Sequence, residues 1–202
     1  MDDLVFALFS SRDDDGAREL DGIVTRLSRA LPCPPRRIEL MHRGPLDISP
    51  SSRVFALLIQ EGDSYRRLKE TGCVVSRPLL GSSEDAQEAA KCLNLTLPRQ
   101  DGTVYILLAH GSHNHSVRYH DVLSECLRDD IILTDLDSCR SSIPDCQHPV
   151  LVPFLLSFGH HAKEAASRLE KMNSALTVFR QGILSTCPAL EAVFRRRLQE
   201  IM

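Results

Sequence analysis

In Val104-Tyr-Ile-Leu-Leu-Ala-His-Gly-Ser112, an almost unbroken apolar run is followed by a histidine. A run in which polar residues do not alternate with apolar ones is typical of a strand buried on both faces of a parallel sheet. A second apolar run, 150–158, leads into Gly159-His-His-Ala162. These stretches predict two neighbouring parallel strands, each followed by histidine.

On both sides of this stretch, predicted strands alternate with predicted helices along the chain. Strands are predicted at 4–9, 37–41, 54–59, 73–80, 103–109, 131–136, 150–158 and 175–179. The first helix carries an apolar stripe of Leu20, Ile23, Val24, Leu27 and Leu31. Further helices are predicted from about 63, at 83–94, 116–127 and 160–172, and along the apolar stripe 190–201.

This alternation is typical of parallel sheets with helices on both faces. The alternation of predicted strands and helices begins a second time after residue 97. The predicted fold is therefore α/β, with two similar half-domains, 1–97 and 98–202, and an active cleft between them.

The composition is that of a globular protein with an apolar core. Of 202 residues, 43% are apolar and 25% are charged. The net charge is −3 and no basic block stands out, so nucleic acid is not an expected partner. No apolar run reaches the ~20 residues of a membrane span, and Asp2 and Asp3 stand where a secretory signal is basic. We expect a cytoplasmic protein without membrane contacts, and leave a homo-oligomer open.

Three residues at predicted strand ends suggest a metal site. His110 and His161 follow the two apolar runs, and Asp137 follows the strand at 131–136. Ligands of open α/β sheets bind beyond the carboxyl ends of the strands. Two imidazoles and a carboxylate suit cobalt, nickel, iron or zinc, and three protein ligands leave a position open for a reactant. The alternative for each histidine alone is a capping or hydrogen-bonding role.

Five ordered stretches are similar to motifs of one enzyme family. They lie at 62–65 (Gly-Asp-Ser-Tyr), 76–83, 107–112 (Leu-Leu-Ala-His-Gly-Ser), 152–162 and 187–194. On these stretches the chain resembles the anaerobic sirohydrochlorin cobaltochelatases, which are class II chelatases with a ferrochelatase-like fold. The resemblance covers nearly the whole chain.

The resemblance implies a lyase of the anaerobic cobalamin pathway that inserts a divalent metal, cobalt in the family, into a sirohydrochlorin-type tetrapyrrole. It implies that His110, Asp137 and His161 bind the metal and that His110 also accepts the pyrrole protons. A neutral imidazole near pH 7 suits both tasks. Nickel, iron and zinc remain alternatives to cobalt(II).

The substrate-binding residues are expected around the same cleft. Ser10, Ser11 and Arg12 follow the first strand, and an arginine suits a polycarboxylate macrocycle. Ser64, in the Gly-Asp-Ser-Tyr stretch, is also expected to bind substrate. Two loop histidines, His113 and His115, would extend the site or line its rim. The alternative for Arg12 is a solvated surface position.

One departure from the family pattern opens a second hypothesis. Ser64 stands where the family has a glutamate, and a serine cannot act as a general base or carry a charge. The chain would then be a non-catalytic tetrapyrrole- or metal-binding protein on a chelatase scaffold. A third hypothesis is a flavodoxin-like domain whose histidines lie at the sheet edge by chance.

Overall fold

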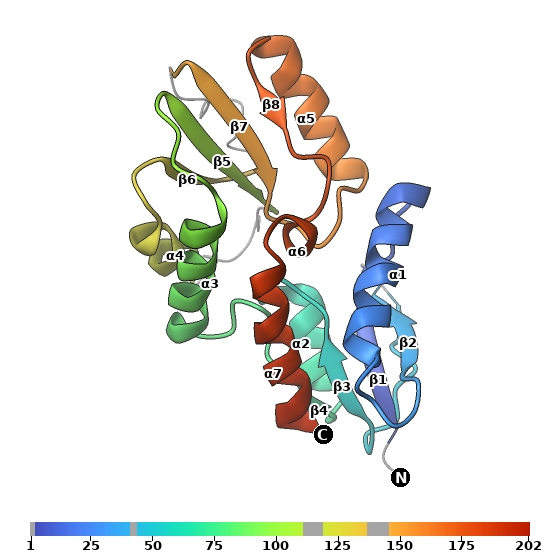
Figure 1. The fold of residues 1–202 in the computed structure, drawn as a ribbon. Coiled ribbons are helices and arrows are strands. Elements are labelled where there is room, and N and C mark those ends of the chain that lie inside the picture. The colour runs from blue at the N-terminus through green and yellow to red at the C-terminus, as the bar shows by residue number, and fades with distance from the viewer. Residues whose placement is uncertain (1–2, 41–43, 111–118, 137–145) are drawn as a thin grey trace.

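The computed structural model describes residues 3–40, 44–110, 119–136 and 146–202. Within them lie two four-stranded sheets in which all neighbouring strands are parallel (Figure 1). The first, ordered β2-β1-β3-β4, consists of β1 (Leu4–Leu8), β2 (Arg36–Glu39), β3 (Arg53–Ala56) and β4 (Val74–Val75). The second, ordered β6-β5-β7-β8, consists of β5 (Thr103–Ala109), β6 (Ile131–Asp135), β7 (His148–Pro153) and β8 (Thr177–Val178). The same order in both sheets confirms the prediction of two similar α/β half-domains.

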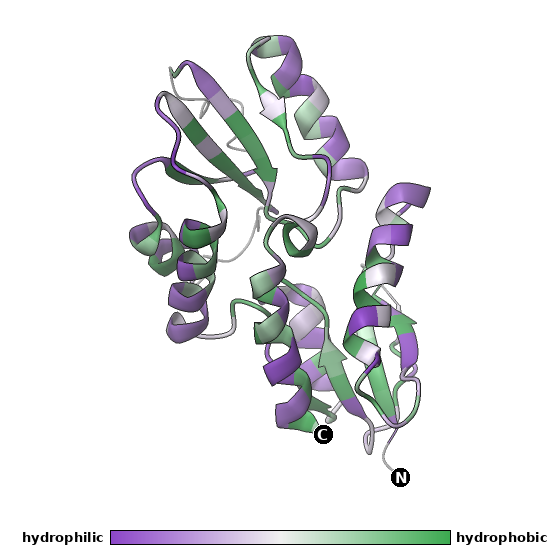
Figure 2. Cartoon of the chain, viewed as in Figure 1, coloured by the Kyte–Doolittle hydropathy of each residue, from purple (hydrophilic) through white to green (hydrophobic). Residues whose placement is uncertain are grey.

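Helices cover the faces of both sheets. They are α1 (Asp14–Ser28), α2 (Asp63–Glu70), α3 (Ser83–Thr96), α4 (His120–Cys126), α5 (His160–Met172), α6 (Ile183–Thr186) and α7 (Glu191–Ile201), with the short turn η2 (Pro188–Leu190) before α7. The strands are largely apolar, whereas polar residues gather on the helices (Figure 2). None of these described helices has the length and apolar character that crossing a membrane requires.

Alternate residues of each strand face different helices. In β1, Phe6 lies in one buried cluster with Ile23 of α1, whereas Val5 lies in another with Leu68 of α2. The second sheet is built in the same way, with α5 packed on one face and α3 and α4 on the other. The central strands β1, β3, β5 and β7 are thus buried on both faces, which explains their near-continuous apolar runs.

Two helices cross from one half of the molecule to the other. Helix α3 ends the first half of the chain but packs against α4, where Asn94 Nδ2 donates to the Cys126 carbonyl oxygen at 2.9 Å. Helix α7 ends the second half but packs against β3, and the ring centroids of Phe194 and Phe55 are 6.0 Å apart. The division at residue 97 therefore stays a prediction, because helices on both sides of it are exchanged.

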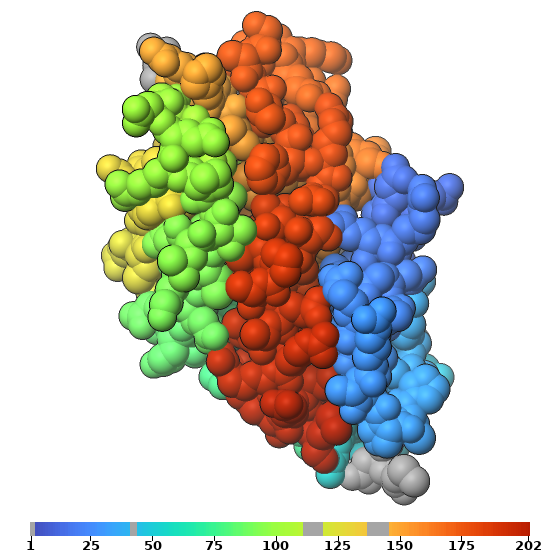
Figure 3. Space-filling model, in the orientation of Figure 1, coloured from blue at the N-terminus to red at the C-terminus, as the bar shows by residue number. Residues whose placement is uncertain are grey.

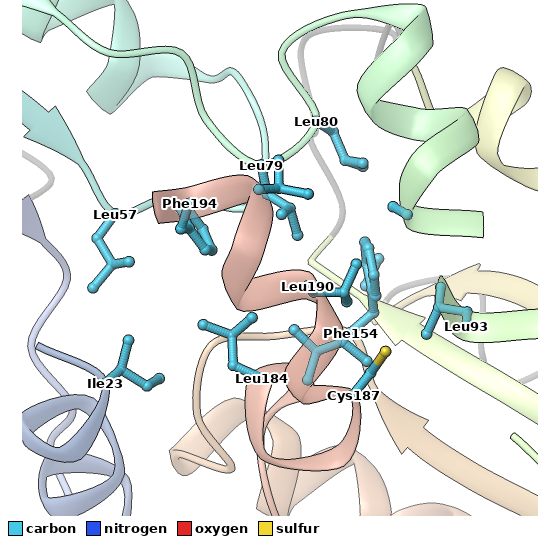
Figure 4. Packing of buried hydrophobic residues seen from close by; sticks show 14 of the residues in the cluster. Ile23, Leu57, Leu79, Leu80, Leu93, Phe154, Leu184, Cys187, Leu190 and Phe194 are labelled. Carbon is cyan, nitrogen blue, oxygen red and sulfur yellow. The ribbon is translucent and has the colours of Figure 1, made fainter. Parts of the chain in front are cut away.

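The C-terminal segment that contains α6, η2 and α7 lies in the middle of the molecule. In Figure 3, the band formed by α6 and α7 runs between the N-terminal region with α1 and the region that includes α3. The close-up in Figure 4 places Leu184 and Leu190 of this band between Ile23 on one side and Phe154 on the other. All four side chains belong to one buried cluster, so the two halves share a core.

The predicted strand 150–158 is shorter in the structure, because β7 ends at Pro153. Beyond it, the Leu155 carbonyl oxygen accepts a hydrogen bond from Ile183 N at 2.7 Å, at the start of α6. The backbone here pairs with a helix start instead of a neighbouring strand. Residues 154–159 therefore form a loop, which we call the α5 loop, between β7 and the two histidines that begin α5.

Gly182, the N-cap of α6, lies directly against the α5 loop. A Cβ at this position would be 2.2 Å from the Leu156 carbonyl oxygen, which is backbone and cannot rotate away. We expect Gly182→Ala to lower the free energy of unfolding by about 1–3 kcal/mol through overpacking, as measured by urea denaturation. Gly62→Ala is the matched control, since Gly62 is also a helix N-cap but a Cβ there would meet nothing within 4 Å. Equal losses in both variants would contradict the prediction.

Candidate active site

Two histidines predicted at strand ends meet in the structure. His110 directly follows β5 and His161 is the second residue of α5, and their ring centroids are 5.8 Å apart with planes at 86°. With a metal–nitrogen bond of about 2.1 Å, each ring centre lies roughly 3 Å from a bound ion. Two imidazoles that share an ion therefore have ring centres about 5 Å apart in tetrahedral geometry and at most about 6 Å apart when they lie opposite each other. The observed spacing of 5.8 Å lies within this limit, and both side chains are accessible to solvent.

The sheet topology brings these histidines together. Strands β5 and β7 are parallel neighbours, with Leu108 opposite Pro153 near their carboxyl ends. His110 lies just beyond this edge, and the α5 loop carries the chain from the same edge to His161. Their meeting thus follows from strand order, although 51 positions separate them in the sequence (161 − 110).

The surroundings of His161 favour its neutral form. Burial lowers the pKa of His161 because it removes water from the charged ring, and the neighbouring His110 and His160 lower it further. The guanidinium of Arg12, from the other half of the molecule, also lowers this pKa. A neutral imidazole has the lone pair that a metal ion or a proton requires.

The residues predicted to bind substrate differ in their surroundings. Arg12 is exposed and within electrostatic range of His161, as expected for a cleft residue. The Ser11 hydroxyl instead forms a local hydrogen bond, in which its Oγ donates to Asp13 Oδ2 at 3.2 Å. Ser10 is exposed, and Ser64 is half-buried in the first turn of α2. The structure thus places Arg12 near the histidine pair, and gives Ser11 a local partner.

Three predicted site residues, Asp137, His113 and His115, lie outside the described residues. Within the described part of the chain, no three His, Cys, Asp or Glu side chains gather closely enough to hold one ion. The described donors of the candidate site are therefore the pair His110 and His161. The ligand roles of all these residues stay predictions.

Gln60 is a residue of the site region that the sequence analysis did not find. It lies just beyond β3 of the first half, and its Nε2 donates to the backbone oxygen of His110 at 3.1 Å. Its Oε1 is buried and has no hydrogen-bond partner among the residues described. The signal was present, because Gln60 is a polar residue that follows an apolar strand, as His110 does.

An ion pair beside His161 was also missed. Asp13 caps α1 by accepting a hydrogen bond from Gly16 N, and Lys163 Nζ of α5 lies 2.8 Å from Asp13 Oδ1. The hydrogen bond from Lys163 lowers the pKa of Asp13. This pair joins the start of α1 to the first turn of α5. An aspartate before an amphipathic helix signals the cap, but not the distant lysine.

His120, at the start of α4, is a buried histidine with its own consequence. Burial lowers its pKa, and this effect is partly opposed by Asp121 and Asp135. Its Nε2 is buried with no hydrogen-bond partner among the described residues. Because the folded pKa lies below the ordinary value of about 6.5, the unfolded chain binds more protons below that pH. Stability is thus unaffected above this value and is lost as pH falls toward the folded pKa.

We therefore expect His120→Gln to flatten the pH dependence of stability between about pH 7 and pH 5. The measurement is the free energy of unfolding in urea at several pH values, for the wild type and the variant. His148→Gln, the same change at an exposed histidine that begins β7, is the control. If the slopes of wild type and His120→Gln coincide, burial of His120 does not disfavour its charged form.

A separate hollow of about 600 Å³ lies at the other end of the second sheet. Its lining includes Thr103 and Val104, which begin β5, whereas His110 follows the end of that strand. Two of its acidic side chains form ion pairs: Asp130 with Arg128 at 2.8 Å and Asp129 with Arg99 at 3.6 Å. This hollow is therefore not the site formed by the histidines.

Comparison with solved structures places this geometry in a known fold. SirB from Bacillus subtilis, solved with Fe³⁺, matches with a TM-score of 0.59 and 14% identity, over 100% of this chain and 96% of SirB. A multi-domain protein of Deinococcus radiodurans, described as structurally similar to chelatases, matches with a TM-score of 0.56 and 17% identity. The chain thus has a chelatase-like fold. No protein-family model and no curated protein sequence matches the chain.

The chelatase fold accounts for both halves of the chain. The Deinococcus protein has two additional domains, and the match covers 100% of this chain but 56% of that protein. The third hypothesis, a flavodoxin-like domain, is wrong because the chain forms two separate four-stranded sheets. The likeness to these two structures thus shows the fold of the chain, and does not show the cobalt-specific family.

Proposed function

We propose that this chain is a chelatase that inserts a divalent metal into a sirohydrochlorin-type tetrapyrrole. The observation that carries the proposal is the pair His110 and His161, with ring centroids 5.8 Å apart, at the carboxyl edge of the second sheet of a chelatase fold. Paired imidazoles beside an open position suit an ion that is held briefly and then passed on.

The chemistry that these residues would perform is a balanced exchange. One divalent ion enters the macrocycle while two pyrrole N–H bonds break, so two protons leave. His110 would accept these protons one at a time and release each to solvent, to which its side chain is accessible. His161, whose pKa is lowered by burial, would stay neutral and hold the ion as it loses water. Arg12 would bind a carboxylate at the rim of the macrocycle.

We infer cobalt(II) as the metal from the sequence resemblance, with a role in the anaerobic cobalamin pathway. Iron is the alternative, because SirB was solved with Fe³⁺. The donor set does not separate the two, since imidazole suits several first-row metals. Asp137, proposed as the third ligand, would add an oxygen donor.

A second candidate function is binding without catalysis. It is favoured by Ser64, which lies in the first turn of α2 and supplies no carboxylate there. The neighbouring Asp63 has an ion pair with Arg66, with atoms 3.2 Å apart. In this alternative the protein would hold a tetrapyrrole or a metal and pass it on unchanged.

One anaerobic experiment separates the two functions. Sirohydrochlorin is mixed with cobalt(II), iron(II), nickel(II) or zinc(II), with and without the protein, and the macrocycle absorbance is followed. A chelatase raises the rate at which the metallated spectrum appears, and the metal with the largest increase is the proposed substrate. An absorbance shift at unchanged rate would overturn the chelatase proposal in favour of the binding protein.

A further inference from the structure

The carboxylate of Glu19 joins α1 to two segments of the other half of the molecule. Its Oε2 accepts a hydrogen bond from Phe158 N at 3.0 Å. Its Oε1 accepts one from Gly182 N and one from Ser185 Oγ, each at 2.7 Å. These partners lie 139 to 166 positions away in the sequence. A single side chain thus binds both the α5 loop and the start of α6.

The α5 loop is held between Glu19 and α6. Leu155 accepts from Ile183 N at 2.7 Å, and the backbone of Leu156 lies against Gly182. Phe158 is buried in the cluster beneath α5, and its N–H donates to Glu19. His160 and His161, the first two residues of α5, follow two and three positions later. The position of His161 therefore depends on a loop whose last turn is bonded to Glu19.

The first turn of α1 also contacts the start of α5 directly. A Cβ on Gly16 would be 3.2 Å from Gly159 Cα, so the two backbones are closely packed. Lys163, two residues after His161, pairs with Asp13 at 2.8 Å. Contacts from α1 thus lie on both sides of His161, at Phe158 and Gly159 before it and at Lys163 after it.

We propose that Glu19 is a positioning residue for metal insertion: its carboxylate holds the α5 loop so that His161 faces His110 across the space that a metal ion would occupy. The proposal rests on the proposed function. Its physical basis is that ligand geometry must be kept within a fraction of an ångström, because a displacement of about 1 Å can cost roughly 100-fold in rate. Groups that orient metal ligands typically contribute about 10- to 100-fold in affinity or activity.

Glu19→Gln tests this role with little change in shape. The carboxamide oxygen can keep the bonds from Gly182 N and Ser185 Oγ, but its NH₂ group then faces the N–H of Phe158, so the loop bond is lost. We expect the affinity for cobalt(II) alone, measured by anaerobic titration, to fall about tenfold. The ligand-field absorbance of bound cobalt(II) should also change, and kcat should fall while KM for the macrocycle stays the same.

Two matched variants separate positioning from stability. Ser185→Ala removes a hydrogen bond to the same carboxylate but leaves the loop bond to Phe158, so it should lower Tm without changing cobalt affinity or spectrum. Asp21→Asn alters another carboxylate of α1, whose partner Arg37, at 2.7 Å, lies in β2 of the same half. It too should leave cobalt binding unchanged. Glu19→Asp, which keeps the charge but shortens the reach, replaces Glu19→Gln if that variant does not fold.

The results distinguish the two proposals. If Glu19→Gln lowers only Tm, and binds cobalt with the affinity and spectrum of the wild type, the positioning role is overturned. If the wild type binds cobalt but does not accelerate its insertion, the proposed function alone is overturned. A loss of cobalt affinity in Glu19→Gln that neither Ser185→Ala nor Asp21→Asn shows would support the positioning role.

Discussion

His110→Ala and His161→Ala are each expected to lower the rate of metal insertion at least about 100-fold, because each removes a donor and His110 is also the proposed base. Both side chains are accessible to solvent, so little buried contact is lost and the fold should persist. The measurement is the anaerobic rate of metallation of sirohydrochlorin, with circular dichroism to verify folding. Cobalt affinity, measured without the macrocycle, should fall in both variants.

His160→Ala is the control for this pair. His160 is exposed and its ring centroid is 5.6 Å from that of His161. Neighbouring residues of a helix point about 100° apart, so we expect only one of the two to face His110. The variant should therefore lose far less activity than His161→Ala. Full activity in His110→Ala or His161→Ala, or an equal loss in His160→Ala, would contradict the assigned roles.

The largest expected effect on stability is at a buried ion pair between the two exchanged helices. Asp85 of α3 and Arg197 of α7 form a salt bridge, and each side chain is only 2% exposed. Arg197→Met would leave the Asp85 carboxylate buried without this partner. We expect the free energy of unfolding to fall by about 3–5 kcal/mol, as measured by urea denaturation. Arg196 is more exposed and pairs with Glu88 at 2.6 Å and with Asp85 at 3.5 Å. Because Asp85 keeps Arg197 in Arg196→Met, this variant should cost at most about 1 kcal/mol.

The double variant Asp85→Leu with Arg197→Met should be much more stable than Arg197→Met alone. The pair is imperfectly satisfied, because Asp85 Oδ2 and Arg197 Nε have no hydrogen-bond partner among the described residues. Replacing both members of such a pair by apolar side chains is often neutral or stabilising. A double variant as unstable as the single one would show that the cost lies in packing and not in an unpaired charge.

Most of the architecture could be predicted from local patterns. The apolar run 103–109 became β5 with the predicted bounds, and the stripe that includes Leu20 and Ile23 became the buried face of α1. The predicted strand at 73–80 is reduced to the two residues of β4. Its later part runs beside the segment that follows β3: Leu79 N donates to the Leu58 carbonyl oxygen at 2.9 Å, and Leu80 forms an isolated bridge to Gln60. A run of apolar residues indicates that a segment is buried, but it does not distinguish a strand from a buried loop.

The candidate site divides in the same way. His110 and His161 were predicted because each follows an apolar run, and the carboxyl ends of parallel strands meet at one edge. Gln60 and Glu19 were not predicted, because each acts on a backbone group far away in the sequence. Gln60 does have a signal in the sequence, since it follows an apolar strand, but nothing in the sequence marks Glu19 or the backbone partner of either residue.

The order of strands and helices, their buried faces and the histidines at strand ends could all be predicted from local patterns. These features follow from the period of apolar residues, which is a property of neighbours along the chain. Two further features become visible in the folded chain alone: α3 and α7 pack against the opposite half, and Glu19 binds the loop before His161. Such contacts depend on which surfaces pack against each other in the folded chain. Their free energy comes from pairs of segments that are distant in the sequence, and the local period of apolar residues carries no information about such pairs.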